Sequence, residues 1–271
     1  MKRFTLVSCI LLGAFLLSAC SGARSASWPG LAADGTTAYL ASGQFIFAVN
    51  LSDGKKVWQY PPQGGNQSFN ANPVVSPDGQ LLVASAGTDH GLYSLDVKTG
   101  KEKWAAPFTG ATSGWIAAPL LVGDTIYAAN TDGLLYAVKL ATGEKSWSLR
   151  LSDALWGSPA SNGKLIFIAS LDHFLYAVDP ATQQVAWKVD VGGAVPSAPV
   201  VSQDGTTLFL GSSARKIFAI DTATGASHWT ADTKDWIWGT PTLSGDSIFA
   251  AYQRKCIFIR GGQWEGSLAD H

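Results

Sequence analysis

Charged side chains are scarce in this 271-residue chain, where Lys, Arg, Asp and Glu make up 14% of the residues. An average soluble domain has roughly 25%. The 19 basic and 20 acidic residues nearly balance, so no long-range field attracts the chain to a polyanion. A disordered chain and a coiled coil need many charges, and a nucleic-acid-binding protein needs an excess of Lys and Arg. The composition therefore excludes these three classes, and we expect no nucleic-acid partner.

Cysteine is equally scarce, with three residues in the whole chain. Cys9 lies in an apolar run, residues 4–17, which follows Lys2 and Arg3 and leads to the sequence Leu-Ser-Ala-Cys ending at Cys20. A basic start, a short apolar run and small residues are typical of a secretory signal peptide, and the run is too short for a stable membrane span. Cys256 then stands alone, so we expect no disulfide in the exported domain.

The four residues that end at Cys20 resemble the lipobox of bacterial lipoproteins. That resemblance implies a signal peptide at 1–19, lipid acylation of the Cys20 thiol, and anchoring to a membrane outside the cytosol. Two or three acyl chains are enough for a stable anchor. Residues 20–27 then form the acylated cysteine and a short flexible tether rich in Gly, Ser and Ala. Ser21 follows the cysteine where an inner-membrane lipoprotein would carry Asp, which favours the outer membrane or the cell surface.

What the chain has in abundance is Gly, with 29 residues, and Trp, with 11. Five eleven-residue windows align without gaps and each ends in a Trp, at 58, 104, 147, 187 and 229, so the period is 40 to 46 residues. Turn dipeptides such as Asp34-Gly35 and Asn162-Gly163 separate runs of β-branched and aromatic residues, as in hairpins. A period near 43 with four short strands per unit indicates an all-β fold, a β-propeller of four-stranded blades.

The repeated pattern Ala-x-Asp-x-x-Thr-Gly-x-x-x-Trp resembles the tryptophan-docking motif of the PQQ-like propeller repeats. In that family the Trp packs between neighbouring blades, the Ala lies beneath it, and the Thr-Gly forms a turn. Gln183 replaces the turn glycine of the fourth window, and we expect a different turn there. Carried over, the resemblance implies these docking residues: Trp58, Trp104, Trp147, Trp187, Trp229, Ala48, Ala137, Ala177, Ala219, Gly54, Gly100, Gly143 and Gly225.

Residues 28–271 form the predicted propeller domain and have room for about six blades at this period. The last blade loses the motif near Trp264. Either a degenerate outer strand closes the ring into a rigid disc, or the chain is a shortened form of a longer propeller. Well-known members of the family lie at the upper end of the usual four to eight blades, about two more than this chain provides.

The resemblance implies two functional classes. Quinoprotein dehydrogenases hold pyrroloquinoline quinone and a metal ion with carboxylate and amide oxygens, and several carry two adjacent cysteines. This chain lacks the cysteine pair, its acidic residues fall at repeated turn positions, and His90 and His173 occupy equivalent turns without metal-ligand spacing. We therefore expect no enzyme activity, no cofactor and no metal. A quinoprotein-like or quinone-binding protein remains the alternative.

The second class contains non-catalytic lipoproteins of the outer-membrane assembly type, typified by BamB, which bind other envelope proteins through loops at the rim of the propeller. We expect this class, with a monomer that binds envelope proteins through variable connections on a rigid ring. The candidate binding connections are residues 60–72 and 104–115. A further alternative is a propeller that binds glycans or small ligands by stacking on the Trp residues that begin four of the units, Trp28, Trp115, Trp156 and Trp238, and on Trp236 beside the last of them.

Overall fold

The computed structural model describes residues 30–151, 153–245, 247–252, 255–260 and 263–267. The signal peptide, Cys20, the tether and Trp28 lie outside the described residues. The described part contains strands β1 to β23 and no helix, so it offers no helical segment that could cross a membrane.

The strands are β1 (Gly30–Ala33), β2 (Thr37–Ser42), β3 (Phe45–Asn50), β4 (Lys56–Tyr60), β5 (Val74–Val75), β6 (Gln80–Ala84), β7 (Leu92–Asp96), β8 (Leu120–Val122), β9 (Thr125–Ala129), β10 (Leu134–Lys139), β11 (Lys145–Arg150), β12 (Ala160–Ser161), β13 (Ile166–Ala169), β14 (Phe174–Asp179), β15 (Gln184–Asp190), β16 (Val200–Val201), β17 (Thr207–Ser212), β18 (Lys216–Asp221), β19 (Ser227–Asp232), β20 (Thr242–Ser244), β21 (Ser247–Tyr252), β22 (Lys255–Arg260) and β23 (Gln263–Ser267).

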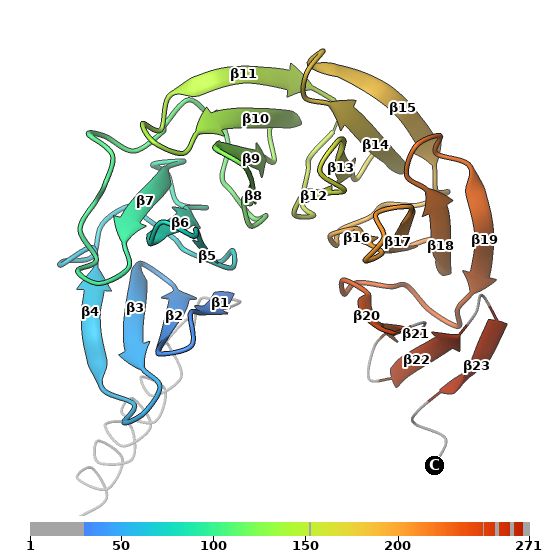
Figure 1. Cartoon of the computed structure of the whole chain (residues 1–271), viewed down its shortest axis with the longest axis horizontal. Coiled ribbons are helices and arrows are strands. Elements are labelled where there is room, and N and C mark those ends of the chain that lie inside the picture. The colour runs from blue at the N-terminus through green and yellow to red at the C-terminus, as the bar shows by residue number, and fades with distance from the viewer. Residues whose placement is uncertain (1–29, 152, 246, 253–254, 261–262, 268–271) are drawn as a thin grey trace, which may run out of the picture.

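These strands form six antiparallel sheets in which each strand pairs with its neighbours in the sequence. We number the sheets as blades 1 to 6: β1–β4, β5–β7, β8–β11, β12–β15, β16–β19 and β20–β23. The blades follow one another along an arc, with their first strands toward the centre and their last strands at the periphery (Figure 1). The predicted all-β propeller of about six blades is therefore confirmed.

The arc is not closed between blade 1 and blade 6, which lie on either side of an opening (Figure 1). Of the two alternatives, the described residues form an open arc and not a closed ring. The strand register of blade 6 supplies a physical reason. In blade 5, Ala219 pairs with the docking residue Trp229, whereas the corresponding pair in blade 6 is Phe258 with Gly266. Blade 6 therefore has no indole at the position from which the other blades reach their neighbour.

Blade 2 differs from the predicted four-stranded unit because its sheet has three regular strands. The segment around Trp104 pairs with β7 only through isolated bridges, Leu95 with Glu102 and Leu92 with Phe108. Pro107 lies directly before the second bridge. Proline has no N–H to donate to a ladder, so the peripheral strand of this blade is interrupted.

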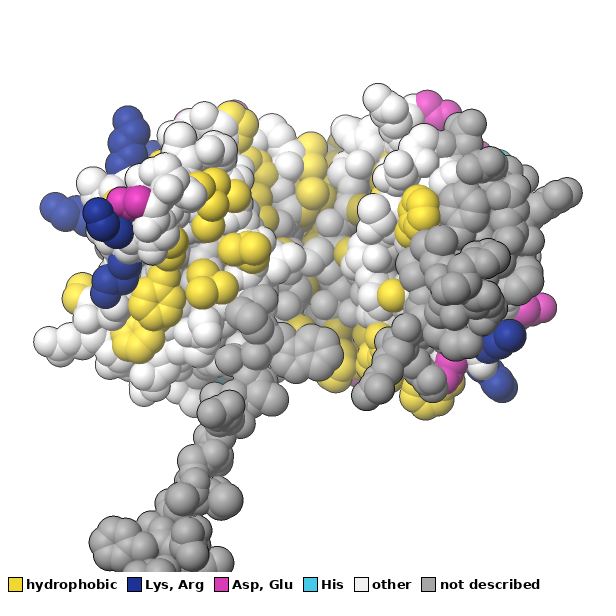
Figure 2. All heavy atoms as spheres, turned by 90° about the horizontal axis from the view of Figure 1, so that it is seen from below, with side chains coloured by type: hydrophobic (Ala, Val, Ile, Leu, Met, Phe, Trp, Pro, Cys, Tyr) yellow, Lys and Arg dark blue, Asp and Glu magenta, His cyan; other side chains and the backbone are white. Residues whose placement is uncertain are grey.

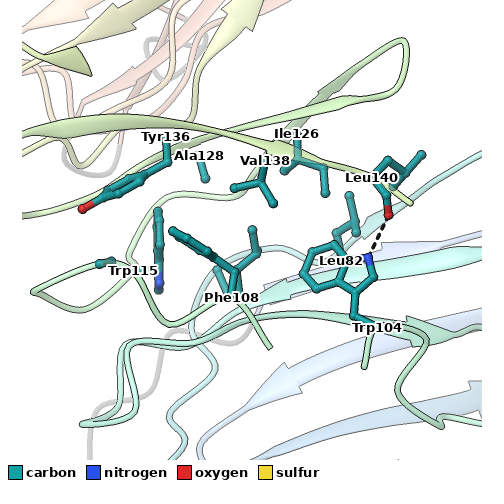
Figure 3. Close-up of a cluster of buried hydrophobic side chains, with 12 residues drawn as sticks. Leu82, Trp104, Phe108, Trp115, Ile126, Ala128, Tyr136, Val138 and Leu140 are labelled. Atoms are coloured by element: carbon teal, nitrogen blue, oxygen red, sulfur yellow. Dashed lines mark hydrogen bonds between the residues drawn. The ribbon is translucent and has the colours of Figure 1, made fainter. Parts of the chain in front are cut away.

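Aromatic side chains fill the layer between successive blades. Trp104 of blade 2 is 5% exposed, and its Nε1 donates a hydrogen bond of 2.7 Å to the carbonyl of Leu140 in blade 3 (Figure 3). Trp115 and Phe108 pack with Tyr136 in the same cluster, with ring centroids 5.5 Å apart in both pairs. This junction thus buries a set of large apolar side chains and satisfies the indole N–H of Trp104.

The docking alanines lie directly opposite the docking tryptophans in the strand register. Ala48, Ala137, Ala177 and Ala219 pair with Trp58, Trp147, Trp187 and Trp229, and all four alanines are fully buried. A bulge follows each of these pairs. The small alanine side chain leaves room for the indole beside it on the same sheet. The neighbouring blade packs against both residues.

The turn glycines adopt a left-handed backbone, with φ of 69° at Gly54 and Gly100, 76° at Gly143 and 75° at Gly225. The expectation of a different turn at Gln183 is wrong. Gln183 has φ of 59°, and its N–H donates to the carbonyl of Asp179 at 2.8 Å, as Gly100 does to Asp96. The carboxylate of Asp179 accepts a hydrogen bond from the N–H of Ala181 and so fixes the same turn. Gln183 therefore adopts the strained left-handed conformation.

Candidate functional site: an aromatic pocket on one rim

One rim of the propeller carries the connections between blades. Because the strands of a blade are antiparallel, the link from the last strand of one blade to the first strand of the next lies on the same rim as the turn between the second and third strands. Residues 191–199 and 233–241 are such links, and residues 170–173 and 213–215 form such turns. This rim holds the candidate site.

A buried apolar residue anchors each link to the preceding blade. Its N–H donates to a carbonyl in the turn between the second and third strands, as Ile237 does to Ser212 at 3.4 Å and Val195 does to Ser170 at 3.3 Å. The five anchors are 0% to 1% exposed: Phe69, Trp115, Leu155, Val195 and Ile237. The residues before and after an anchor consequently point toward the rim surface.

A glycine allows the anchor Ile237 to pack. A Cβ on Gly211 of β17 would lie 2.2 Å from Cγ2 of Ile237, which is far inside van der Waals contact. Ile237 therefore occupies the space that a side chain at position 211 would need, and it joins the cluster of Ile217, Ile248 and Ala250 between blades 5 and 6. This packing holds the flanking residues, Trp236 and Trp238, in fixed places on the rim.

Three tryptophans meet in one pocket over blades 4 to 6. Trp156, Trp236 and Trp238 are 38%, 48% and 57% exposed, and the last two rings lie 6.0 Å apart. The pocket has a volume of about 300 Å³ and is completed by Leu171, Ala194, Pro196, Ser213 and Ile237. Its lining contains no charged side chain and one hydroxyl, so its chemistry suits an apolar group.

The predicted ligand-stacking tryptophans separate into two kinds. Trp156, Trp236 and Trp238 are brought together, whereas Trp115 is fully buried and donates its Nε1–H to the carbonyl of His90 at 2.8 Å. The prediction that Trp115 stacks on a ligand is therefore wrong. Trp115 is a packing anchor like Leu155, one position before the rim residue.

The signal that separates these kinds is the distance to the following proline. Anchors lie four residues before it, as Trp115 does before Pro119, and rim residues lie three before it, as Trp156 does before Pro159. Counting from the proline would also have paired Trp238 with Trp156 and assigned Ile116, which is 43% exposed, to the rim of blade 3. An alignment of the units by their first tryptophan places blade 3 one residue out of register with the other blades.

The two predicted binding connections lie on this same rim but over blades 1 to 3. Each is anchored by buried residues, Phe69 and Ala71 in residues 60–72, and Phe108, Ala111 and Trp115 in residues 104–115. Between Pro62 and Asn66 the first connection is exposed. None of these residues lines the aromatic pocket, so the structure keeps the predicted loops and the tryptophan pocket apart.

The repeated acidic residues support the turns of the rim. Asp132 accepts hydrogen bonds from the N–H of Leu134 and from the hydroxyl of Tyr136, at 3.0 and 2.7 Å. Asp89 and Asp172 accept from Tyr93 and Tyr176 in the same way. Burial, followed by the hydrogen bond to Asp132, raises the pKa of Tyr136 well above its ordinary value of 10. Each carboxylate is thus used locally, with its tyrosine.

The neighbouring position in these turns requires a left-handed backbone. His90 and His173 have φ of 45° and 76°, and Gly133 and Arg215 take the equivalent places with 82° and 60°. The two histidines are therefore turn residues on separate blades. Within the described ranges, no group of three or more His, Cys, Asp or Glu side chains could hold a metal ion.

Comparisons with known proteins agree with this architecture. The sequence profile described as outer membrane protein assembly factor BamB matches residues 18–149 and 171–259. No curated protein matches the sequence. The crystal structure of BamB from Moraxella catarrhalis is similar with a TM-score of 0.71 at 17% identity, over 88% of this chain and 75% of that one. A computationally designed protein, Ika8, is similar with a TM-score of 0.71 at 13% identity, over 87% and 69%.

The two solved structures share the fold with this chain at low sequence identity. The profile match is the stronger evidence for family membership, because it covers well over half of the residues. Both matched parts contain the docking motif: Trp58, Trp104 and Trp147 in the first, and Trp187 and Trp229 in the second. The chain therefore belongs to the PQQ-like repeat family of the outer membrane protein assembly factor BamB.

Proposed function

We propose that this protein is a non-catalytic scaffold of the bacterial envelope that takes part in outer-membrane protein assembly. In this proposal Cys20 carries the lipid anchor, the chain is a monomer on the periplasmic side of the outer membrane or on the cell surface, and the aromatic pocket receives an apolar segment of an envelope protein. Family membership supports the scaffold role. The observation that carries the proposal is the pocket of Trp156, Trp236 and Trp238 on one rim.

The exposed indoles argue for a protein partner. Exposed apolar patches are costly in water and mark interaction sites, and tryptophan is enriched among the residues that dominate binding energy at interfaces. The link that carries Trp236 and Trp238 is held by the buried Ile237 and by the hydrogen bond from the N–H of Thr233 to the carbonyl of Arg215 at 2.8 Å. A partner would thus meet indoles that are already ordered, and little conformational entropy would be lost on binding.

A glycan suits this pocket less well. Sugars stack on aromatic faces but also need hydrogen-bonding groups for their hydroxyls, because an unpaired polar group in an apolar pocket is costly. Ser213 supplies the single polar side chain of the lining. The pocket therefore favours a side chain such as Leu, Phe or Pro of a partner over a sugar ring.

Site-specific photocrosslinking of the full lipoprotein in its native envelope tests this proposal. A photoreactive phenylalanine replaces Lys234, an exposed residue next to the pocket on the same link as Trp236. The matched control places it at Lys164, an exposed residue in the turn between β12 and β13 on the opposite rim. We expect a crosslink from position 234, and none from 164, to a component of the outer-membrane assembly machinery.

Three results would overturn the proposal. They are no adduct from position 234, the same adducts from both positions, or an adduct from 234 that contains no envelope assembly protein. Retention of the lipidated chain in the cytoplasmic membrane would contradict the proposed localisation separately, because the crosslinking result does not depend on which membrane carries the anchor.

A further inference from the structure

The aromatic pocket presents three indoles to one small space. Trp156 belongs to the link into blade 4, and Trp236 and Trp238 belong to the link into blade 6. The planes of Trp236 and Trp238 are inclined by 47°, so these two rings do not lie flat on each other. All three side chains are exposed. Indole faces are therefore open to a ligand from two different links of the rim.

The face of an indole attracts positive charge. The π electrons give the ring a quadrupole whose negative side lies above and below the plane. A cation over such a face is attracted to it, and tryptophan gives the strongest attraction among the aromatic residues. A neutral apolar group gains the burial of its surface but not this attraction. Three indoles in one pocket therefore favour a cation that sheds its water at little cost.

The lining also selects between kinds of cation. Ser213 is its single polar side chain. A primary ammonium group has three N–H donors, and burying donors without acceptors is costly. A quaternary ammonium group has no N–H and presents methyl groups, which suit the apolar side chains of Leu171, Ala194 and Pro196. The pocket therefore favours a trimethylammonium group over the primary ammonium group of lysine or ethanolamine.

The charges around the pocket leave room for a cation. No Lys, Arg or His side chain lines it. Asp172 and Asp235 are direct neighbours of lining residues in the chain, whereas His173, Arg215 and Lys234 lie two residues from one and are exposed. Figure 2, which looks into the opening of the arc, shows charged side chains at the outer sides of the two lobes and mostly apolar and uncharged ones between them. A cation in the pocket therefore meets no repelling side chain in the lining.

The size and rigidity of the pocket fit a small head group. Its volume is about 300 Å³, at the lower end for small-molecule sites. Ile237 is buried between Trp236 and Trp238 and holds both in place, and the ring of Pro196 fixes its own φ. A ligand therefore meets preformed faces, and little affinity is lost to ordering the protein.

We propose that the aromatic pocket binds a quaternary ammonium group, with its positive charge over the indole faces of Trp156, Trp236 and Trp238. Free choline carries this group, and so does the head group of phosphatidylcholine. The ligand and the apolar segment of an envelope protein would occupy the same space, so each excludes the other. Binding of the ligand is a property of the chain alone, so its failure leaves the scaffold role standing, and failure of the crosslink from position 234 leaves the ligand site standing.

Calorimetric titration of the purified full chain in a maltoside detergent, which has no ammonium group, tests this proposal. The probes are choline, its neutral isostere neohexyl alcohol, in which carbon replaces the nitrogen, and ethanolamine. We expect choline to bind about tenfold or more tightly than either of the others. Equal or tighter binding of neohexyl alcohol or of ethanolamine, or no saturable binding of choline, overturns the proposal.

Glycerophosphocholine, the head group of the lipid without its acyl chains, distinguishes the two sources of the ligand. Tighter binding than that of choline assigns the site to a lipid head group, and weaker binding assigns it to a free ligand. Either result supports the quaternary ammonium site, because both probes carry the same trimethylammonium group.

Trp238→Leu separates the attraction of the ring face from apolar contact, because leucine is apolar but has no ring. The variant should bind choline about fivefold or more weakly, with an unchanged thermal midpoint because Trp238 is exposed. Ile116→Leu is the matched control, since Ile116 is the equivalent rim residue of blade 3 and does not line the pocket. An unchanged choline affinity in Trp238→Leu, or the same loss in Ile116→Leu, overturns the proposal.

Discussion

The indole of Trp58 donates a hydrogen bond of 2.9 Å to the carbonyl of Val97, 39 residues further along the chain. One side chain thereby spans nearly a whole repeat and joins blade 1 to blade 2. The same relationship recurs between Trp104 and Leu140 and between Trp187 and Thr222. Rigidity of the arc therefore rests on a small set of indoles, each of which contributes apolar contact and one buried hydrogen bond.

Trp104→Ala should destabilise the protein by about 3 to 5 kcal/mol, because it opens a cavity between blades 2 and 3 and leaves the carbonyl of Leu140 without its donor. Trp104→Phe keeps most of the ring contact and should cost about 1 to 2 kcal/mol. Urea unfolding monitored by circular dichroism measures both. Equal stability of Trp104→Ala and the wild type would contradict the role of the indole layer.

Gln183→Gly should stabilise the protein by about 1 kcal/mol, because a glutamine at φ of 59° is replaced by the residue that adopts this conformation without strain. The opposite exchange, Gly143→Gln, should destabilise it by more. Besides the strain, a Cβ at position 143 would lie 2.6 Å from Cε3 of Trp104. If Gln183 adopts the same turn as the glycines of the other blades, the thermal midpoints of the two variants shift in opposite directions. Midpoint shifts of the same sign would show that it does not.

Gly211→Ala should destabilise the protein by about 1 to 3 kcal/mol, because the new methyl group would lie 2.2 Å from Cγ2 of Ile237. Gly239→Ala is the matched control, since no described atom lies within 4 Å of its Cβ position. Calorimetry of the pair separates the packing of Ile237 from the general effect of removing a glycine. A harmless Gly211→Ala would mean that the link bearing Trp236 and Trp238 is not anchored by this contact.

Acid should weaken the fold through the turn carboxylates. The hydroxyl of Thr99, followed by backbone N–H groups, donates to Asp96 and lowers its pKa below the ordinary 3.8, and Thr224 does the same for Asp221. A carboxyl whose pKa is lower in the folded state contributes stability above its unfolded pKa, and that contribution is lost as the pH falls through its folded pKa. The free energy of unfolding should therefore decrease as the pH falls below 3.8.

Asp96→Asn is the check on that assignment. The amide oxygen still accepts a hydrogen bond but does not titrate, so the decrease below pH 3.8 should become smaller than in the wild type. Urea titrations between pH 7 and pH 2.5 provide the measurement. An identical pH profile for wild type and variant would remove Asp96 from the explanation.

The repeat made the fold predictable, because five tryptophans at near-constant spacing leave few architectures other than a propeller. The conformation of Gln183 was not predictable from its type. Glutamine seldom adopts a positive φ, and here the fixed ends of the β14–β15 hairpin and the Asp179 carboxylate impose it. The interrupted fourth strand of blade 2 had a signal in Pro107, which lacks the N–H of a ladder position.

The site was half predictable. The sequence names Trp156, Trp236 and Trp238 among the residues of the ligand-stacking alternative, but that they meet over one pocket follows from the curvature of three blades and not from their spacing. Trp115 has the same residue type in nearly the same place, yet it is an anchor, because one residue along an extended link reverses the side chain from the surface to the core.

The most direct test of the central claim measures how much outer-membrane assembly protein co-purifies with the full lipidated chain from solubilised envelopes. The double variant Trp236→Ala, Trp238→Ala is compared with the wild type and with Val185→Ala, which removes an exposed apolar side chain on the peripheral strand β15. Recovery should fall by about tenfold or more in the double variant and stay unchanged in Val185→Ala. Equal recovery with all three proteins would contradict it.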